Sequence, residues 1–128
     1  AVCDLCAAPG GKASALLESL TRTGWLLANE VIQSRVNVLR YNLSRTGSLR
    51  YIVTQDDTSN LANAWGEQFD VILVDAPCSG QSLTVKSKRG DNAFDSRHIE
   101  HAAARQRRIL DDAIHMLKVG GHIVYSTC

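Results

Sequence analysis

The stretch Asp4-Leu5-Cys6-Ala7-Ala8-Pro9-Gly10-Gly11-Lys12 decides how this chain begins to fold. It follows an apolar run and precedes an amphipathic pattern, so it predicts the end of a strand, a tight turn and the start of a helix. Its glycines let a ligand approach the backbone, and the N–H groups at the helix start favour a carboxylate or phosphate. A plain strand-to-helix turn is the alternative interpretation. A Walker phosphate loop is excluded, because Cys6 stands where it needs glycine and Ala13 where it needs Ser or Thr.

Five β-like runs alternate with helical patterns along the chain. The runs are residues 1–6, 25–30, 50–55, 69–75 and 122–127. Strands that alternate with helices imply βαβ units, so the sequence predicts an α/β fold with a mostly parallel sheet. In such sheets ligands bind at the carboxyl ends of the strands.

Four helices are expected between these runs, because apolar residues recur there at intervals of three or four. The longest spans residues 97–118 and is predicted to end at Gly120-Gly121, while Gly24 is predicted to close the first. Residues 80–96 are polar and without period, which predicts a substrate loop. The expected inward faces are Ala13, Leu16, Leu17 and Leu20; Ile32, Val36, Leu39 and Leu43; Leu61 and Trp65; and Ile99, Ala102, Ala103, Ile109, Leu110, Ala113 and Leu117.

Length and composition set the broad class. A chain of 128 residues that is 45% hydrophobic can form one domain with a core. A formal net charge of +1 does not demand nucleic acid, so an RNA partner would need a local basic patch or another domain. Without a secretory pattern or a long apolar stretch, we expect a cytosolic protein. The chain begins and ends within predicted strands, and we expect a segment of a longer protein.

Two of the four cysteines follow predicted strands. Cys78 lies in Asp75-Ala76-Pro77-Cys78-Ser79-Gly80, and Cys128 ends Tyr125-Ser126-Thr127-Cys128. If the two strands are sheet neighbours, the thiols approach one another across the cleft. Either cysteine alone could be a small core hydrophobe. Their shared placement beside Asp75 and a polar loop favours thiol chemistry.

Other polar residues carry weaker signals. Glu30 ends the second run, where dinucleotide-binding folds place the carboxylate for ribose hydroxyls. Cys3 and Cys6 form a C-x-x-C, but no second pair exists, and we predict no metal site. Phosphate contact is the alternative to a solvated face for the arginines of the long helix. Solvated or structural roles are expected for His98, His101, His115, His122, Arg105, Arg107 and Arg108.

Together these motifs resemble the RNA cytosine-5 methyltransferases of the NOL/NOP/Sun (RsmB/NOP) type, which use S-adenosylmethionine. The resemblance runs from Asp4 to Cys128. It implies a Rossmann-like class I methyltransferase core, truncated before its last strands, with residues 1–128 as a partial catalytic domain. The signatures appear in the family's order: residues 4–12, Leu27-Ala28-Asn29-Glu30, residues 75–80, Gly120-Gly121 and Tyr125-Ser126-Thr127-Cys128.

The resemblance also implies roles for the matching residues. Cys128 would be the nucleophile and Cys78 the second cysteine, which helps to release the product. A thiolate added to carbon 6 of an unstacked cytosine lets carbon 5 take the methyl group. Asp75, held neutral near the base, would protonate ring nitrogen 3. The implied cofactor-binding residues are Cys6, Ala7, Ala8, Pro9, Gly10, Gly11 and Lys12, then Glu30 at the ribose, Asp57 near the adenine and Asp75 near the methyl donor.

The implied substrate is ribosomal RNA first and transfer RNA second. The implied protein is a monomer without metal or membrane partners, cytoplasmic, or nuclear or nucleolar in a eukaryote. DNA cytosine-5 methyltransferases are a rival, because they place their nucleophile where Cys78 stands, but they lack the Thr-Cys ending. A catalytically silent RNA-binding or ribosome-assembly module would not need both cysteines. A small-molecule or protein methyltransferase would not need paired thiols either.

Overall fold

The computed structural model describes residues 1–78 and 96–127. The expected loop lies outside the described residues except for Ser96, which begins the last helix, and Cys128 lies outside them as well. The described elements alternate as the sequence predicts. They are β1 (Val2–Asp4), α1 (Gly11–Ser19), β2 (Leu26–Asn29), α2 (Gln33–Ser44), β3 (Tyr51–Thr54), α3 (Thr58–Trp65), β4 (Phe69–Asp75), α4 (Ser96–Met116) and β5 (Leu117–Ser126).

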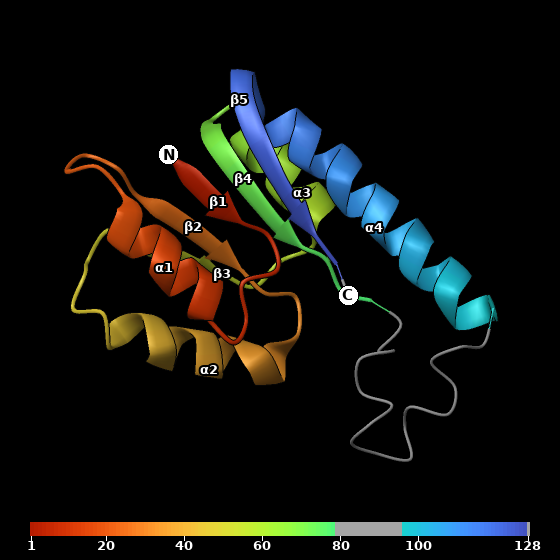
Figure 1. Ribbon diagram of the computed structural model, residues 1–128, viewed down its shortest axis with the longest axis horizontal. Coiled ribbons are helices and arrows are strands. Elements are labelled where there is room, and N and C mark those ends of the chain that lie inside the picture. The colour runs from red at the N-terminus through yellow and green to blue at the C-terminus, as the bar shows by residue number, and fades with distance from the viewer. Residues whose placement is uncertain (79–95, 128) are drawn as a thin grey trace.

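The five described strands form one sheet in the order β3-β2-β1-β4-β5, and every pair is parallel. This confirms the predicted α/β, Rossmann-like class. The chain starts in the middle of the sheet, builds outward to β3, and then returns to place β4 on the other side of β1 (Figure 1). The strand order therefore reverses between β1 and β4, and ligands bind at such a switch point, beyond the carboxyl ends of the strands.

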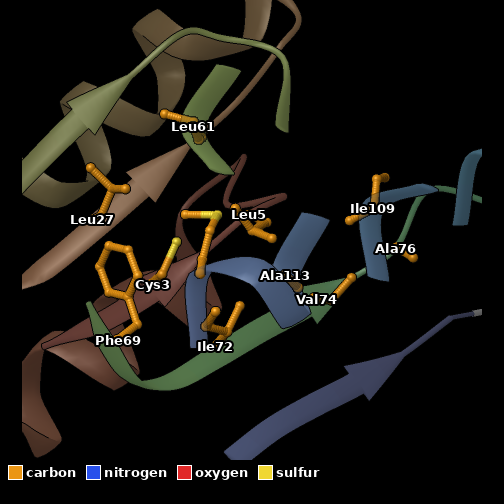
Figure 2. Close-up of a cluster of buried hydrophobic side chains, with 11 residues drawn as sticks. Cys3, Leu5, Leu27, Leu61, Phe69, Ile72, Val74, Ala76, Ile109 and Ala113 are labelled. Carbon is orange, nitrogen blue, oxygen red and sulfur yellow. The ribbon is translucent and has the colours of Figure 1, made fainter. Parts of the chain in front are cut away.

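Helices cover both faces of the sheet, with α1 and α2 on one side and α3 and α4 on the other (Figure 1). Neighbouring β2 residues point to opposite faces, so Leu26 packs with α1 and α2 while Leu27 packs with α3 and α4. Figure 2 shows the core between the sheet and helices α3 and α4. In it, Phe69, Cys3 and Leu27 gather at one end and Ile109 and Ala76 at the other. A sheet buried on both faces explains why its central strands read as continuous apolar runs.

The last helix and strand begin and end differently from the prediction. α4 ends at Met116, and β5 already begins at Leu117, where it pairs with Phe69. The register then shifts between Phe69 and Val71. Gly120, with φ of +83°, lies in this irregular stretch, and a Cβ on Gly121 would come within 2.8 to 3.0 Å of Leu117 and of the Asp70 carbonyl. The two glycines therefore serve the irregular start of β5 and do not end the helix.

Most of the predicted inward residues are buried. Two were wrong, because Ile32 precedes α2 and is exposed, and Ile99 is exposed on α4. Leu20 and Leu117 do pack against the cores, but Leu20 follows the end of α1 and Leu117 belongs to β5. Gly24 is also wrong as a helix end, since α1 stops at Ser19. Among the described helices, none combines the length and apolar character needed to cross a membrane. The buried predicted residues are Ala13, Leu17, Val36, Leu39, Leu43, Leu61, Ala102, Ile109 and Ala113.

Candidate active site

A cavity of about 570 Å³ opens at the carboxyl end of the sheet, beside the switch between β1 and β4. The turn after β1, the residues after β2, β3 and β4, and one face of α4 all contribute to its wall. The predicted site residues that line it are Cys6, Ala8, Glu30, Asp57, Asp75 and Cys78. Ala7, Pro9, Gly10, Gly11 and Lys12 are not among its lining residues.

The turn after β1 is held from both sides. The Cys6 N–H donates to Asp4 Oδ1 at 3.2 Å, and the Ala7 N–H donates to the Asn29 carbonyl at 2.8 Å. Gly10 caps α1 with φ of +115°, a conformation that favours glycine. A Cβ there would also lie 3.2 Å from the Asn42 Cβ. The turn is thus fixed before any ligand arrives.

Two side chains of α2 complete this support. Arg35 donates through Nη2 to the Ala8 carbonyl at 2.6 Å, and its Nη1 lies 3.2 Å from Glu30 Oε2. Asn42 donates to the Pro9 carbonyl at 2.7 Å. Arg35 therefore joins the turn to Glu30. Sequence reasoning missed both residues, whose only signal was a polar position on the helix that follows Glu30.

Glu30 is a buried carboxylate at the cavity wall, only 3% exposed. Its Oε1 accepts from the Ile32 N–H at 2.9 Å, and Arg35 neutralises its charge. A buried charge needs such partners to be tolerated. Val31 and Ile32, 58% and 47% exposed, add apolar surface to the same wall. The structure thus places a carboxylate with fixed hydrogen-bond and ion-pair partners next to exposed apolar side chains.

Asp57 is the N-cap of α3, and its side chain also reaches the cavity. Its Oδ1 accepts from the Ser59 N–H at 3.1 Å and from Ser59 Oγ at 2.9 Å, while Arg108 Nη2 lies 3.3 Å from Oδ2. The Ser59 hydrogen bonds, and then the Arg108 charge, hold the pKa of Asp57 below its ordinary value. Asp57 therefore presents an ionised carboxylate.

Asp75, which was expected to be held neutral near the base, accepts hydrogen bonds at both carboxylate oxygens. Lys12 Nζ donates to its Oδ2 at 2.5 Å, and Ser126 Oγ donates to its Oδ1 at 2.6 Å. The hydrogen bond from Lys12, followed by that from Ser126, lowers the pKa of Asp75.

Asp4 shows the opposite behaviour below the same site. It is 1% exposed, and its Oδ2 has no hydrogen-bond partner within residues 1–78 and 96–127. Burial raises the pKa of Asp4 to about 7, opposed mainly by the hydrogen bond from the Cys6 N–H. A buried carboxyl whose pKa is near neutral thus lies next to the turn after β1.

The cysteines divide into two groups. Cys78 is half-buried in the cavity wall. The strands that precede Cys78 and Cys128 are neighbours, with Asp75 opposite Ser126, which meets the condition under which the two cysteines were expected to approach one another. Burial raises the pKa of Cys6 to about 12 and that of the core residue Cys3 well above its ordinary value, so both remain thiols at neutral pH. No group of metal-binding side chains is found in the part of the chain that the structure describes.

A model of the family described as 16S rRNA methyltransferase RsmB/F matches residues 1–128. The chain belongs to this family. Two curated relatives in the RsmB/F family are the ribosomal RNA small subunit methyltransferases F of Shigella dysenteriae, 40% identical, and of Cronobacter sakazakii, 41% identical, each over 127 residues. Each match covers 99% of this chain and 26% of the relative's length.

Solved structures agree with the RsmB/F assignment. NSun6 from Pyrococcus horikoshii with SFG, an analogue of S-adenosylmethionine, gives a TM-score of 0.81 at 31% identity. A methyltransferase homolog protein from the same organism gives 0.80 at 35% identity. Both matches cover 99% of this chain, but 32% and 39% of those chains. The predicted family is thereby confirmed, and its cofactor is S-adenosylmethionine.

Proposed function

We propose that this chain forms the catalytic core of an enzyme that methylates carbon 5 of cytosine in ribosomal RNA. The observation that carries the proposal is that Glu30 and Cys78 line one cavity, so a carboxylate suited to a ribose and a cysteine suited to covalent chemistry on a base share one site. The family and its curated relatives support ribosomal RNA as the substrate. Transfer RNA is the second choice.

The cavity fits S-adenosylmethionine in size and chemistry. Its volume lies within the range of small-molecule sites, roughly 300–1,000 Å³. We propose that Glu30 accepts hydrogen bonds from the ribose hydroxyls and that Val31 and Ile32 contact the adenine. Asp57 would lie near the same adenine. Residues 6–12 would hold the methionine part, with Cys6 and Ala8 in contact and the remaining residues shaping the turn.

Two thiols would divide the covalent chemistry. The cofactor supplies a methyl group activated on a sulfonium sulfur. The Cys128 thiolate adds to carbon 6 of cytosine, and the electron pair displaced from the carbon 5–carbon 6 bond makes carbon 5 the nucleophile. After methylation a base removes the proton on carbon 5, the double bond re-forms, and the bond from carbon 6 to the Cys128 sulfur breaks. We assign help in this release to Cys78.

Asp75 requires a revised role. As a carboxylate held by Lys12 and Ser126, it can accept a hydrogen bond from the exocyclic amino group of cytosine. To protonate ring nitrogen 3, it would first have to gain a proton against the effect of Lys12. We therefore propose that Asp75 orients the base.

A gel experiment tests the proposal. The protein that contains this chain is incubated with S-adenosylmethionine and small-subunit ribosomal RNA, and covalent adducts are separated under denaturing conditions. Cys78→Ala should accumulate a protein–RNA adduct, and Cys78→Ala/Cys128→Ala should form none. Cys3→Ala, which alters a core thiol, should turn over without accumulating adduct.

Other outcomes have defined meanings. An adduct with Cys128→Ala but none with Cys78→Ala would reverse the roles of the two cysteines. If no variant traps RNA and the unmodified protein transfers no methyl group, the proposal fails and a silent RNA-binding module is favoured.

A further inference from the structure

Gln106 of α4 joins the two segments that carry the proposed catalytic cysteines. Its Nε2 donates to the Pro77 carbonyl at 3.0 Å and to Thr127 Oγ1 at 3.0 Å. Its Oε1 accepts from the Tyr125 hydroxyl at 3.0 Å. Pro77 directly precedes Cys78, and Thr127 directly precedes Cys128. One side-chain amide therefore holds the residue before each cysteine.

The register of backbone pairs between β4 and β5 ends at this position, where the Thr127 hydroxyl also lies 3.5 Å from the Ala76 carbonyl. The Ala76 N–H donates to the Ser126 carbonyl at 2.8 Å, just beyond the register pair Asp75 and Ser126. The next residue after Ala76 is Pro77, which has no N–H and cannot continue a ladder of backbone bonds. The Gln106 amide reaches both segments at this point.

The chemistry of the side chain suits the task. A glutamine amide offers two N–H donors and one carbonyl acceptor, and all three of these groups are used here. Gln106 lies between the buried residues Ala102 and Ile109 at helical spacing, on the inward face of α4. Its polar side chain within an apolar helix face could have marked Gln106 in the sequence, but the sequence analysis did not single it out.

We propose that Gln106 is a positioning residue that sets the separation and orientation of the Cys78 and Cys128 segments for attack and release. The inference rests on the proposed function, because it assumes that both cysteines act on one base. Gln106 itself touches neither the cofactor nor the base in this role. It acts through Pro77 and Thr127.

Steady-state kinetics of the complete protein with ribosomal RNA provide the first test. Gln106→Leu removes all three hydrogen bonds, and we expect kcat to fall about 10- to 100-fold, the scale of a misplaced reacting group. The dissociation constant of S-adenosylmethionine should change less than about 2-fold, because Gln106 does not line the cavity. Gln106→Glu keeps the acceptor for Tyr125 but loses both donors, so it should resemble Gln106→Leu.

Two further variants separate positioning from folding. Tyr125→Phe removes only the bond to Oε1, and we expect a loss in kcat of about 2- to 5-fold, the scale of one neutral hydrogen bond. Gln68→Leu changes an exposed glutamine just before β4, at the opposite end of the sheet, and should leave kcat unchanged. If Gln106→Leu and Gln106→Glu keep kcat within about 2-fold, or lose it only in proportion to unfolded protein, the inference is wrong.

Adduct lifetime gives a readout that a structural role would not move. Gln106→Leu alone should prolong the covalent protein–RNA adduct, because release through Cys78 is misaligned. In the Cys78→Ala background the same change should not prolong it further, since release is already lost. Additive effects would overturn the inference. If unmodified protein transfers no methyl group and Cys78→Ala traps no RNA, the proposed function has failed instead.

Discussion

The two ends of the sheet contrast sharply in chemistry. At the amino end, Trp25, Trp65 and Phe69 pack with ring centroids 5.5 to 5.8 Å apart, and Phe69 is fully buried. At the carboxyl end, buried Glu30 lines an open cavity, and buried Asp4 accepts a hydrogen bond from Cys6 of the same cavity wall. Apolar contacts stabilise the first end, whereas the second must hold charges away from water.

This difference teaches where the molecule is stabilised and where it acts. Aromatic contacts at the amino end stabilise the fold without touching a ligand. The carboxyl end keeps an unpartnered carboxyl oxygen on Asp4 and an open cavity, features that oppose stability. Substitutions at the two ends should therefore have separable effects on unfolding and on ligand binding.

The largest expected effect is at the amino end. Phe69→Ala leaves a cavity beside both tryptophans, and the free energy of unfolding should fall by about 3–5 kcal/mol in urea titrations. Phe69→Leu should give a smaller loss, and it can be measured instead if Phe69→Ala does not fold. The affinity of folded molecules for S-adenosylmethionine should stay within about 2-fold, because Phe69 lies outside the cavity. A collapse in that affinity would contradict the separation of the two ends.

Buried Asp4, at the carboxyl end of the sheet, should make the free energy of unfolding depend on pH. Its pKa is raised from 3.8 to about 7, so between these values the folded protein retains a proton that the unfolded chain releases. The free energy of unfolding should therefore fall as pH rises through this window and level off above it, by on the order of a few kcal/mol.

Asp4→Asn cannot titrate at this position and should remove that part of the slope in urea titrations across the same pH range. Asp111→Asn, on the exposed face of α4, should keep it. An unchanged slope in Asp4→Asn would show that burial does not raise the pKa of Asp4.

A substitution of Glu30 should change the affinity for S-adenosylmethionine, which a substitution of Phe69 should leave nearly unchanged. Glu30→Gln should raise the calorimetric dissociation constant of S-adenosylmethionine by about 10- to 100-fold, the scale of hydrogen bonds to a charged group. Glu67→Gln, an exposed change before β4, is the matched control and should leave the constant unchanged. Equal constants for the two variants would remove Glu30 from the cofactor site.

The smallest effect concerns Lys12, whose side chain is 57% exposed. Lys12→Gln should lower the free energy of unfolding at pH 7 by at most about 1 kcal/mol, and by less in high salt. Because the pKa of Asp75 is lowered, the stabilisation is present above pH 3.8 and is lost as pH falls through the folded value. Urea titrations above and below pH 3.8 check this.

Lys118→Gln is the matched control for Lys12, because it breaks an exposed pair with Asp70 at the amino end. It should leave S-adenosylmethionine affinity unchanged. If the Lys12→Gln difference persists at acid pH, the Asp75 pair is not its cause.

The sequence predicted the sheet well, because its central strands are buried on both faces and read as apolar runs. It also predicted that Cys6, Glu30 and Cys78 share a site, whereas the pairing of β4 with β5 was left as a condition. The start of β5 was missed, since Lys118 and the two glycines after it also resemble a helix end. Only the pairing with Phe69 decides between the two.

The missed side chains depend on partners far along the chain. The pKa of Asp75 is lowered by Lys12, 63 residues earlier, and Gln106 contacts Pro77 and Thr127 at separations of 29 and 21 residues. No local pattern contains such pairs. They follow only from the sheet order, which brings the ends of β1, β4 and β5 together.

The most direct measurement is the release of tritium from carbon 5 of cytosine. Ribosomal RNA carrying [5-³H]cytidine is incubated with S-adenosylmethionine and the protein that contains this chain, and tritium in water is counted against methyl groups transferred. Methylation of carbon 5 must displace its hydrogen, so the two should appear in equal amounts. Methyl transfer without tritium release would place the methyl group on another atom and contradict the proposed chemistry.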